Sequence, residues 1–148
     1  MPKEPEFDLD KAHYWFGVEF NNSIFPILEK TGRTDEETEK MISMAYASTL
    51  HWCSYSNHNI MNNARGENMI ATTLTYAGRK ESAIHHAKRN YDIVFSNKDE
   101  VADFDISYAL MVMARANALN KNMPEAKKYY DECRESIENI KTQKTRRS

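Results

Sequence analysis

Two histidines and two carboxylates fall on helical stretches whose other residues on the same face are apolar. They are His51, Glu67, His86 and Asp103. Imidazoles and carboxylates bind divalent metals and move protons in general acid–base catalysis. If the helices that carry them pack together, the four groups can converge into one polar cluster. That arrangement would make the chain a small helical metal-binding protein or a hydrolase-like enzyme.

The spacing of these four residues favours a structural role instead. No HExxH, ExxH or HxxxH pattern places two metal ligands on one side of a helix, and no nucleophile motif accompanies the histidines. Carboxylates near helix N-termini cap the helix and complement its dipole, and a neighbouring His or Arg satisfies them. Glu67 is expected to pair with His86 across a helical hairpin rather than with Arg65, because residues two apart on a helix diverge. We therefore expect neither a metal nor a cofactor.

The elements that position these residues centre on the stretch from Ala64 to Asn90. Apolar residues recur there at the i, i+3, i+4, i+7 spacing of a helix, both before and after Gly78. Glycine suits the left-handed conformation that ends a helix, and the small Ala83 lets two helix backbones approach closely. This stretch is therefore predicted to be a helical hairpin.

The rest of the chain shows the same helical periodicity and no β-type alternation. We predict an all-α fold of about six helices in antiparallel hairpins. Residues 1–8 are expected to form a flexible arm, 9–140 a single helical domain, and 141–148 a disordered basic tail. The Ser- and Asn-rich run that ends at Ala64 is expected to be a loop, and Asp99 or Asp103 is expected to cap the fifth helix.

Composition excludes several classes of partner. The chain has 148 residues, a formal net charge of -2 with both signs interspersed, and no run of apolar residues long enough to span a bilayer. We therefore expect no nucleic-acid and no membrane partner. The two cysteines, Cys53 and Cys133, are expected to pack as small apolar residues inside helices, which suits the reducing cytoplasm.

The hairpin from Ala64 to Asn90 resembles a tetratricopeptide repeat, which is a pair of antiparallel helices with small residues at fixed positions. In the first copy the resemblance depends on Ile70, Ala71, Leu74, Gly78 and Ala83. A second, degenerate copy depends on Met113, Ala114, Ala126 and Tyr130, with Lys121 where the glycine would be. Ala83 and Ala126 are 43 residues apart, which is longer than the usual repeat.

Four short motifs extend the resemblance over most of the chain. They are His51 with Trp52, the ARGE run from Ala64 to Glu67, His85 to Ala87, and Asp103 to Asp105. Together they look like a group of small uncharacterised bacterial proteins with repeat-like helices. That resemblance implies the fold and carries over no catalytic residues.

The repeat resemblance implies a partner-binding face on the first helix of each hairpin. The positions it assigns to that face are Arg65, Asn68, Thr72, Thr75, Tyr76, Tyr108, Met111 and Arg115. Two arginines among hydroxyls, aromatic rings and a methionine can hold an acidic peptide or a chain terminus. The other interpretation is an ordinary solvated helix face with one internal salt bridge.

The function expected from the sequence is therefore a non-enzymatic module that binds a protein or peptide. A homodimer through the aromatic N-terminal helix is one assembly that it allows. The rival is the small helical metal-binding protein or hydrolase-like enzyme built on the four residues of the polar cluster.

Overall fold

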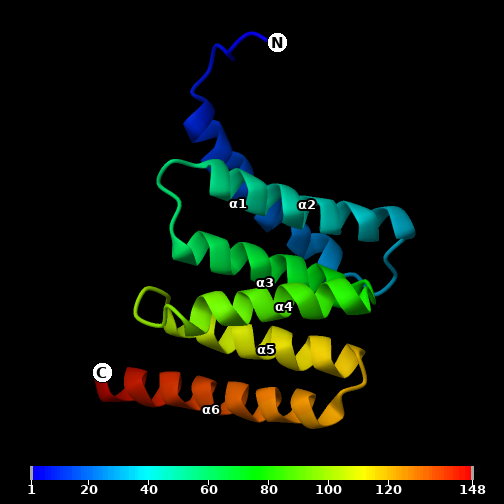
Figure 1. The fold of residues 1–148 in the computed structure, drawn as a ribbon, viewed down its shortest axis with the longest axis vertical. Helices are drawn as coiled ribbons and strands as arrows, with labels where there is room; N and C mark the ends of the chain where they lie inside the picture. Colours follow the sequence, from blue (N-terminus) through cyan, green and yellow to red (C-terminus); the bar gives the residue numbers. More distant parts are fainter. Residues whose placement is uncertain (1, 148) are drawn as a thin grey trace.

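The computed structural model describes residues 2–147, which form six α-helices and no β-strand (Figure 1). The helices are α1 (Leu9–Leu28), α2 (Asp35–Ser54), α3 (Ile60–Tyr76), α4 (Lys80–Phe95), α5 (Asp103–Leu119) and α6 (Met123–Arg147). Their connections alternate between the two ends of the molecule, so consecutive helices are antiparallel. The prediction of an all-α fold with six helices in hairpins is confirmed.

Contacts between alternate helices create one continuous face. Every helix packs on its neighbours in the chain, and α3 also touches both α1 and α5. The first helices of the three hairpins therefore lie side by side. This face is the one on which the repeat resemblance placed partner binding.

The turns of the second and third hairpins have the same backbone geometry. Gly78 has φ 74°, and the amide N–H groups of Gly78 and Arg79 bond back to the last turn of α3. Lys121 has φ 61° and makes the equivalent pair of bonds with Asn122 after α5. Both turns follow the Schellman pattern, in which a left-handed residue satisfies the last helical carbonyls. The hairpin predicted at Gly78 is confirmed, and Lys121 stands where the second glycine was expected.

The main hydrophobic core is formed by residues of α1 to α5, and many of them are small. Ile70, Ala71 and Leu74 of α3 are buried against Ala83 and Ala87 of α4, as the periodicity predicts. Two glycines allow still closer contact. A Cβ at Gly17 would meet the Trp52 ring, and one at Gly66 would meet the Thr49 side chain. These contacts bring both α1 and α3 close to α2.

Some helix boundaries differ from the prediction. The α3 helix begins at Ile60 because Asn59 and Asn62 bond reciprocally to each other's backbone N–H, at 3.0 Å each. The loop is thus confined to residues 55–59. The expected cap of α5 by Asp99 or Asp103 is wrong, since the Asp105 carboxylate accepts the Ala102 N–H at 3.0 Å.

The final helix is longer than the sequence indicated. It continues through residues 141–147, where we expected no regular structure, with the Thr142 hydroxyl bonded to the Glu138 carbonyl. A helical segment that is polar on all sides has no apolar periodicity, which is why the sequence pattern did not predict residues 141–147 to be helical. Residues 2–8 have no helix or strand, and Met1 and Ser148 lie outside the described residues. None of the described helices has the length and apolarity needed to cross a membrane.

Substitutions at the two left-handed turn residues should change stability in opposite directions. Gly78→Ala should lower the free energy of unfolding by about 1 kcal/mol, because a Cβ is disfavoured at positive φ. Lys121→Gly relieves the same penalty and should raise it by up to about 1 kcal/mol. Urea denaturation measures both changes. Gly32→Ala is the control, since its Cβ would meet nothing within 4 Å and its φ is not positive. Equal effects at Gly78 and Gly32 would contradict the account of the turn.

Candidate functional site

A groove of about 320 Å³ follows the face formed by α1, α3 and α5. Six of the eight residues assigned to the binding face line it, and Thr75 and Tyr76 do not. The six are Arg65, Asn68, Thr72, Tyr108, Met111 and Arg115. The tertiary structure thus brings side chains from α3 and α5 together around one concavity.

The groove has apolar walls that the sequence did not assign to it. Phe25 and Leu28 reach it from α1, Trp52 comes from α2, and Met69 from α3. Phe25 is exposed, whereas Trp52 is buried at the contact with Gly17. Periodicity marks such residues only as apolar, and it does not distinguish a core position from a groove wall.

One of the two predicted binding arginines is committed to holding the fold. Arg65 donates from Nε to Asp105 Oδ1 at 3.0 Å and from Nη2 to Oδ2 at 3.2 Å. Asp105 is only 4% exposed. The Arg65 guanidinium also lies over the Phe104 ring, 5.0 Å from its centroid. This bidentate pair links α3 to α5 along the groove. Arg65 therefore forms the internal salt bridge that was the alternative interpretation of this helix face.

The second arginine keeps its charge available. The Arg115 side chain is exposed and lies over the Tyr76 ring at 5.7 Å from its centroid. No carboxylate of the described chain forms a salt bridge with it. Arg33 approaches the same ring at 5.7 Å and donates to three backbone carbonyls, those of Leu28, Lys30 and Tyr76. Arg115 lines the groove, whereas Arg33 lies beside the same ring without lining it.

Asn68 links three helices beneath the groove. Its side-chain nitrogen donates to Asn90 Oδ1 at 3.0 Å and to the Tyr108 carbonyl at 3.1 Å. Asn90 in turn donates to the Ala64 carbonyl at 2.7 Å. Since both amide hydrogens of Asn68 are used, its remaining group for a ligand is the carbonyl oxygen.

The hydroxyls of the predicted binding face are bonded within α3. Thr72 donates to the Asn68 carbonyl and Thr75 to the Ala71 carbonyl, at 2.8 and 2.7 Å. Each oxygen can still accept a hydrogen bond from a ligand. Only Thr72 lies on the groove.

The predicted polar cluster forms only in part. Glu67 is buried and bonds to His86 Nδ1 at 2.6 Å, which confirms the pairing across the hairpin. Arg89 donates to the second oxygen of Glu67 at 3.0 Å, and Tyr46 bonds to His86 Nε2 at 2.9 Å. Burial raises the pKa of the Tyr46 phenol, with the charge of Glu67 adding to the effect, so the phenol is a poor nucleophile near neutral pH.

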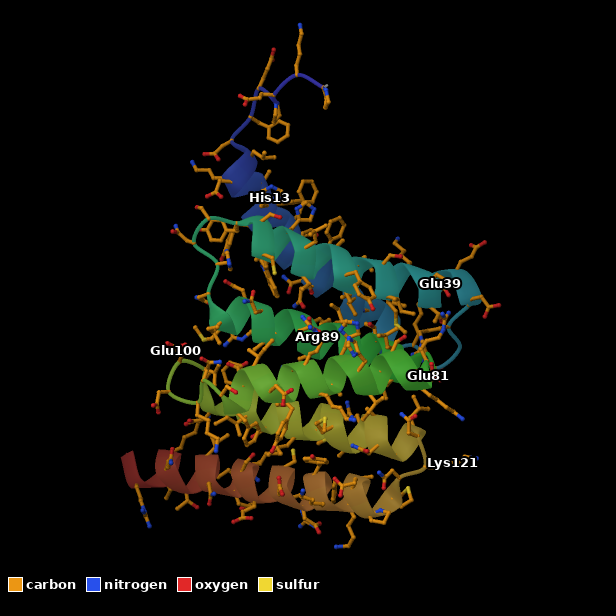
Figure 2. All side chains as sticks on the ribbon, viewed as in Figure 1. His13, Glu39, Glu81, Arg89, Glu100 and Lys121 are labelled. Carbon is orange, nitrogen blue, oxygen red and sulfur yellow. The ribbon has the colours of Figure 1, made fainter. Side chains whose placement is uncertain are left out.

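His51 and Asp103 do not join this cluster, so the four groups do not converge. His51 pairs with His13 of α1, and Asp103 is exposed at the start of α5. Figure 2 shows His13 on α1 well away from Arg89 on α4. In the described part of the chain, no three His, Cys, Asp or Glu side chains come together as a metal site. The sequence shows which helix each group lies on, but not how those helices rotate against one another.

A hydrogen bond joins the rings of the two histidines. His13 Nδ1 and His51 Nδ1 are 2.9 Å apart, so one nitrogen must donate and the other accept. The His51 ring also stacks on Phe16 and Phe20, at centroid distances of 5.2 and 5.9 Å. Burial lowers the pKa of His51, and the nearby His13 lowers it further. This pair is part of the α1–α2 contact.

Comparison of the chain with protein-family models, with curated proteins and with solved structures finds no match in any of the three.

Removing each groove arginine should separate their roles. Arg65→Ala leaves the Asp105 carboxylate buried without its ion partner and should lower the free energy of unfolding by about 2 kcal/mol. Arg115→Ala removes an exposed group and should change it by less than about 0.5 kcal/mol. Urea denaturation followed by circular dichroism gives both values. Similar losses in the two variants would show that the bidentate pair of Arg65 and Asp105 does not link α3 to α5.

The histidine pair should make the fold less stable in mild acid. The unfolded chain protonates His51 near its ordinary pKa of 6.5, whereas the folded chain does so only at lower pH. The unfolded state thus binds more protons below pH 6.5, and the free energy of unfolding falls as the pH drops through that window. His51→Phe should remove this part of the pH dependence, measured by urea denaturation at a series of pH values. His85→Asn, at an exposed position, should keep the wild-type dependence, and an unchanged slope in His51→Phe would contradict the assignment.

Proposed function

We propose that the chain is a non-enzymatic helical-repeat module that binds an extended peptide in the groove between α1, α3 and α5. The observation that carries the proposal is the pairing of an apolar groove with Arg115, whose guanidinium has no carboxylate partner in the described chain. Grooves of roughly 300 Å³ or more are of the size that accepts ligands. A buried apolar side chain of the peptide supplies affinity, and an anionic group at Arg115 fixes its direction.

The chemistry of the groove favours a peptide with both properties. Met69 and Met111 are flexible and polarizable, so they adapt to different apolar side chains. The Tyr76 ring supports the Arg115 guanidinium from below and leaves its donors for a carboxylate. A side-chain carboxylate or a chain terminus satisfies this requirement equally well.

The tetratricopeptide-like character of the chain is part of the same proposal. It is supported by the equal turn geometry at Gly78 and Lys121 and by the common face of α1, α3 and α5. We also propose the cytoplasm as the setting, since Cys53 and Cys133 are both free thiols, and a bacterial origin on the resemblance of the four short motifs alone. Cys133 is buried as expected, whereas Cys53 is exposed.

The rival interpretation as a metal-binding protein or hydrolase required His51, Glu67, His86 and Asp103 to meet. They lie in three separate places, and Glu67 and His86 are held by Arg89 and Tyr46. Neither residue of that pair lines the groove. No observation on these four residues favours the rival over the peptide-binding proposal.

Peptide selection tests the proposal without knowledge of the partner. A random 12-residue peptide library displayed on phage is selected against the wild-type protein, and the recovered peptides are measured by fluorescence polarisation. They should combine a large apolar residue with a carboxylate, and Arg115→Glu should weaken their binding about tenfold or more.

Arg134→Glu on α6 is the matched control, because it makes the same charge change at an exposed position that does not line the groove. Circular dichroism confirms that each variant is folded. Recovery of no peptide, or equal binding by Arg115→Glu and Arg134→Glu, would overturn the proposal.

A further inference from the structure

The segment that precedes α1 carries carboxylates and an aromatic ring, which complement the arginine and the apolar walls of the groove. Residues 2–8 read PKEPEFD and carry carboxylates at Glu4, Glu6 and Asp8 against one lysine. Phe7 among them is 63% exposed, which is unusual for a large aromatic ring. The prolines at positions 2 and 5 favour an extended backbone, so less conformational entropy is lost when the segment binds.

The same segment cannot place its aromatic residue in the groove of its own chain. The groove begins on α1 at Asn21, about 18 Å along the helix from Leu9. Phe7 is two residues before Leu9, so an extended chain folded back along α1 moves it by only about 7 Å. In Figure 1 the segment leaves the N-terminal end of α1 and points away from α3 to α6.

Arg115 is farther away still. It lies with Arg33 at the end of the groove near Leu28, which is about 28 Å along α1 from Leu9. Glu6 is three residues before Leu9 and reaches only about 10 Å. The carboxylate next to Phe7 therefore cannot meet Arg115 within one molecule.

We propose that the groove binds residues 2–8 of a second copy of this chain, with Phe7 between the apolar walls and Glu6 or Glu4 at Arg115. The inference depends on the proposed function, because it names the peptide that the groove binds. An exchange of this kind in both directions is a two-fold symmetric dimer, in which each copy contributes residues to the site of the other.

The surface beside the segment supports a partner of this kind. Leu9, Tyr14 and Trp15, all on the N-terminal half of α1, are each half exposed or more. Exposed large apolar side chains at this end of α1 are available to a molecule that covers it. When the segment enters the neighbouring groove, this part of α1 is brought against the neighbouring molecule and adds to the buried area.

A charge exchange in the 148-residue chain tests the proposal. Sedimentation velocity over a range of concentrations at low salt should show a reversible dimer for the wild type. The double variant Glu4→Lys with Glu6→Lys should raise the dimer dissociation constant about tenfold or more, and Arg115→Glu should do the same. The chain that carries all three changes should regain most of the affinity, because the charges again complement each other.

The matched control reverses two carboxylates away from the segment and the groove. Glu81→Lys with Glu100→Lys makes the same change in net charge at exposed positions on α4 and in the loop before α5, both labelled in Figure 2. This control should leave the dissociation constant unchanged. Phe7→Ser should weaken the dimer without any change of charge.

The outcomes separate this inference from the proposed function. A monomer at every concentration, in a protein that still binds the selected library peptides through Arg115, would overturn the inference and leave the function intact. A dimer that survives all the reversals, or one that the triple variant does not restore, would show that another surface joins the copies. Loss of both dimer formation and library binding would overturn both.

Discussion

The buried carboxylate of Asp105 is the constraint on which the functional face depends. It accepts the N–H of Ala102, the residue that precedes α5, and two hydrogen bonds from the guanidinium of Arg65 on α3. A buried ion pair adds little net stability over an apolar contact, but either partner left alone is costly. Arrangements of α3 and α5 that separate the two residues are therefore disfavoured. The groove is bounded on two sides by the helices that this pair holds together.

The polar residues on the two faces of α3 bond to different helices, so the two faces have different roles. Glu67 faces α4, where it is hydrogen-bonded to His86 and forms a salt bridge with Arg89. Asn68 and Arg65 use their donors on α4 and α5, along the edge of the groove. Arg115 alone of the predicted binding residues brings a charge that forms no salt bridge in the described chain, and the segment before α1 carries charge of the opposite sign.

Local signals account for the parts of the fold that the sequence predicted. Helix periodicity and the left-handed turn at Gly78 each depend on residues within a few positions of one another. The errors at boundaries have local causes too. Asn59 and Asn62 are residue types that favour turns, but their side chains bond to each other's backbone N–H and cap α3. The last turns of α6 have no apolar face that could mark them as helical.

The sequence by itself determined the six helices, their order and the pairing of Glu67 with His86 across one short turn. Only the tertiary structure decided that Arg65 meets Asp105 and that His51 meets His13, which are 40 and 38 residues away. The physical reason is that a helix forms from contacts three and four residues apart, which any stretch of chain carries within itself. The rotation of one helix against another is set by the packing of glycines, alanines and rings such as Gly17 against Trp52. That rotation determines which polar groups become partners and which, like Arg115, stay available to a ligand.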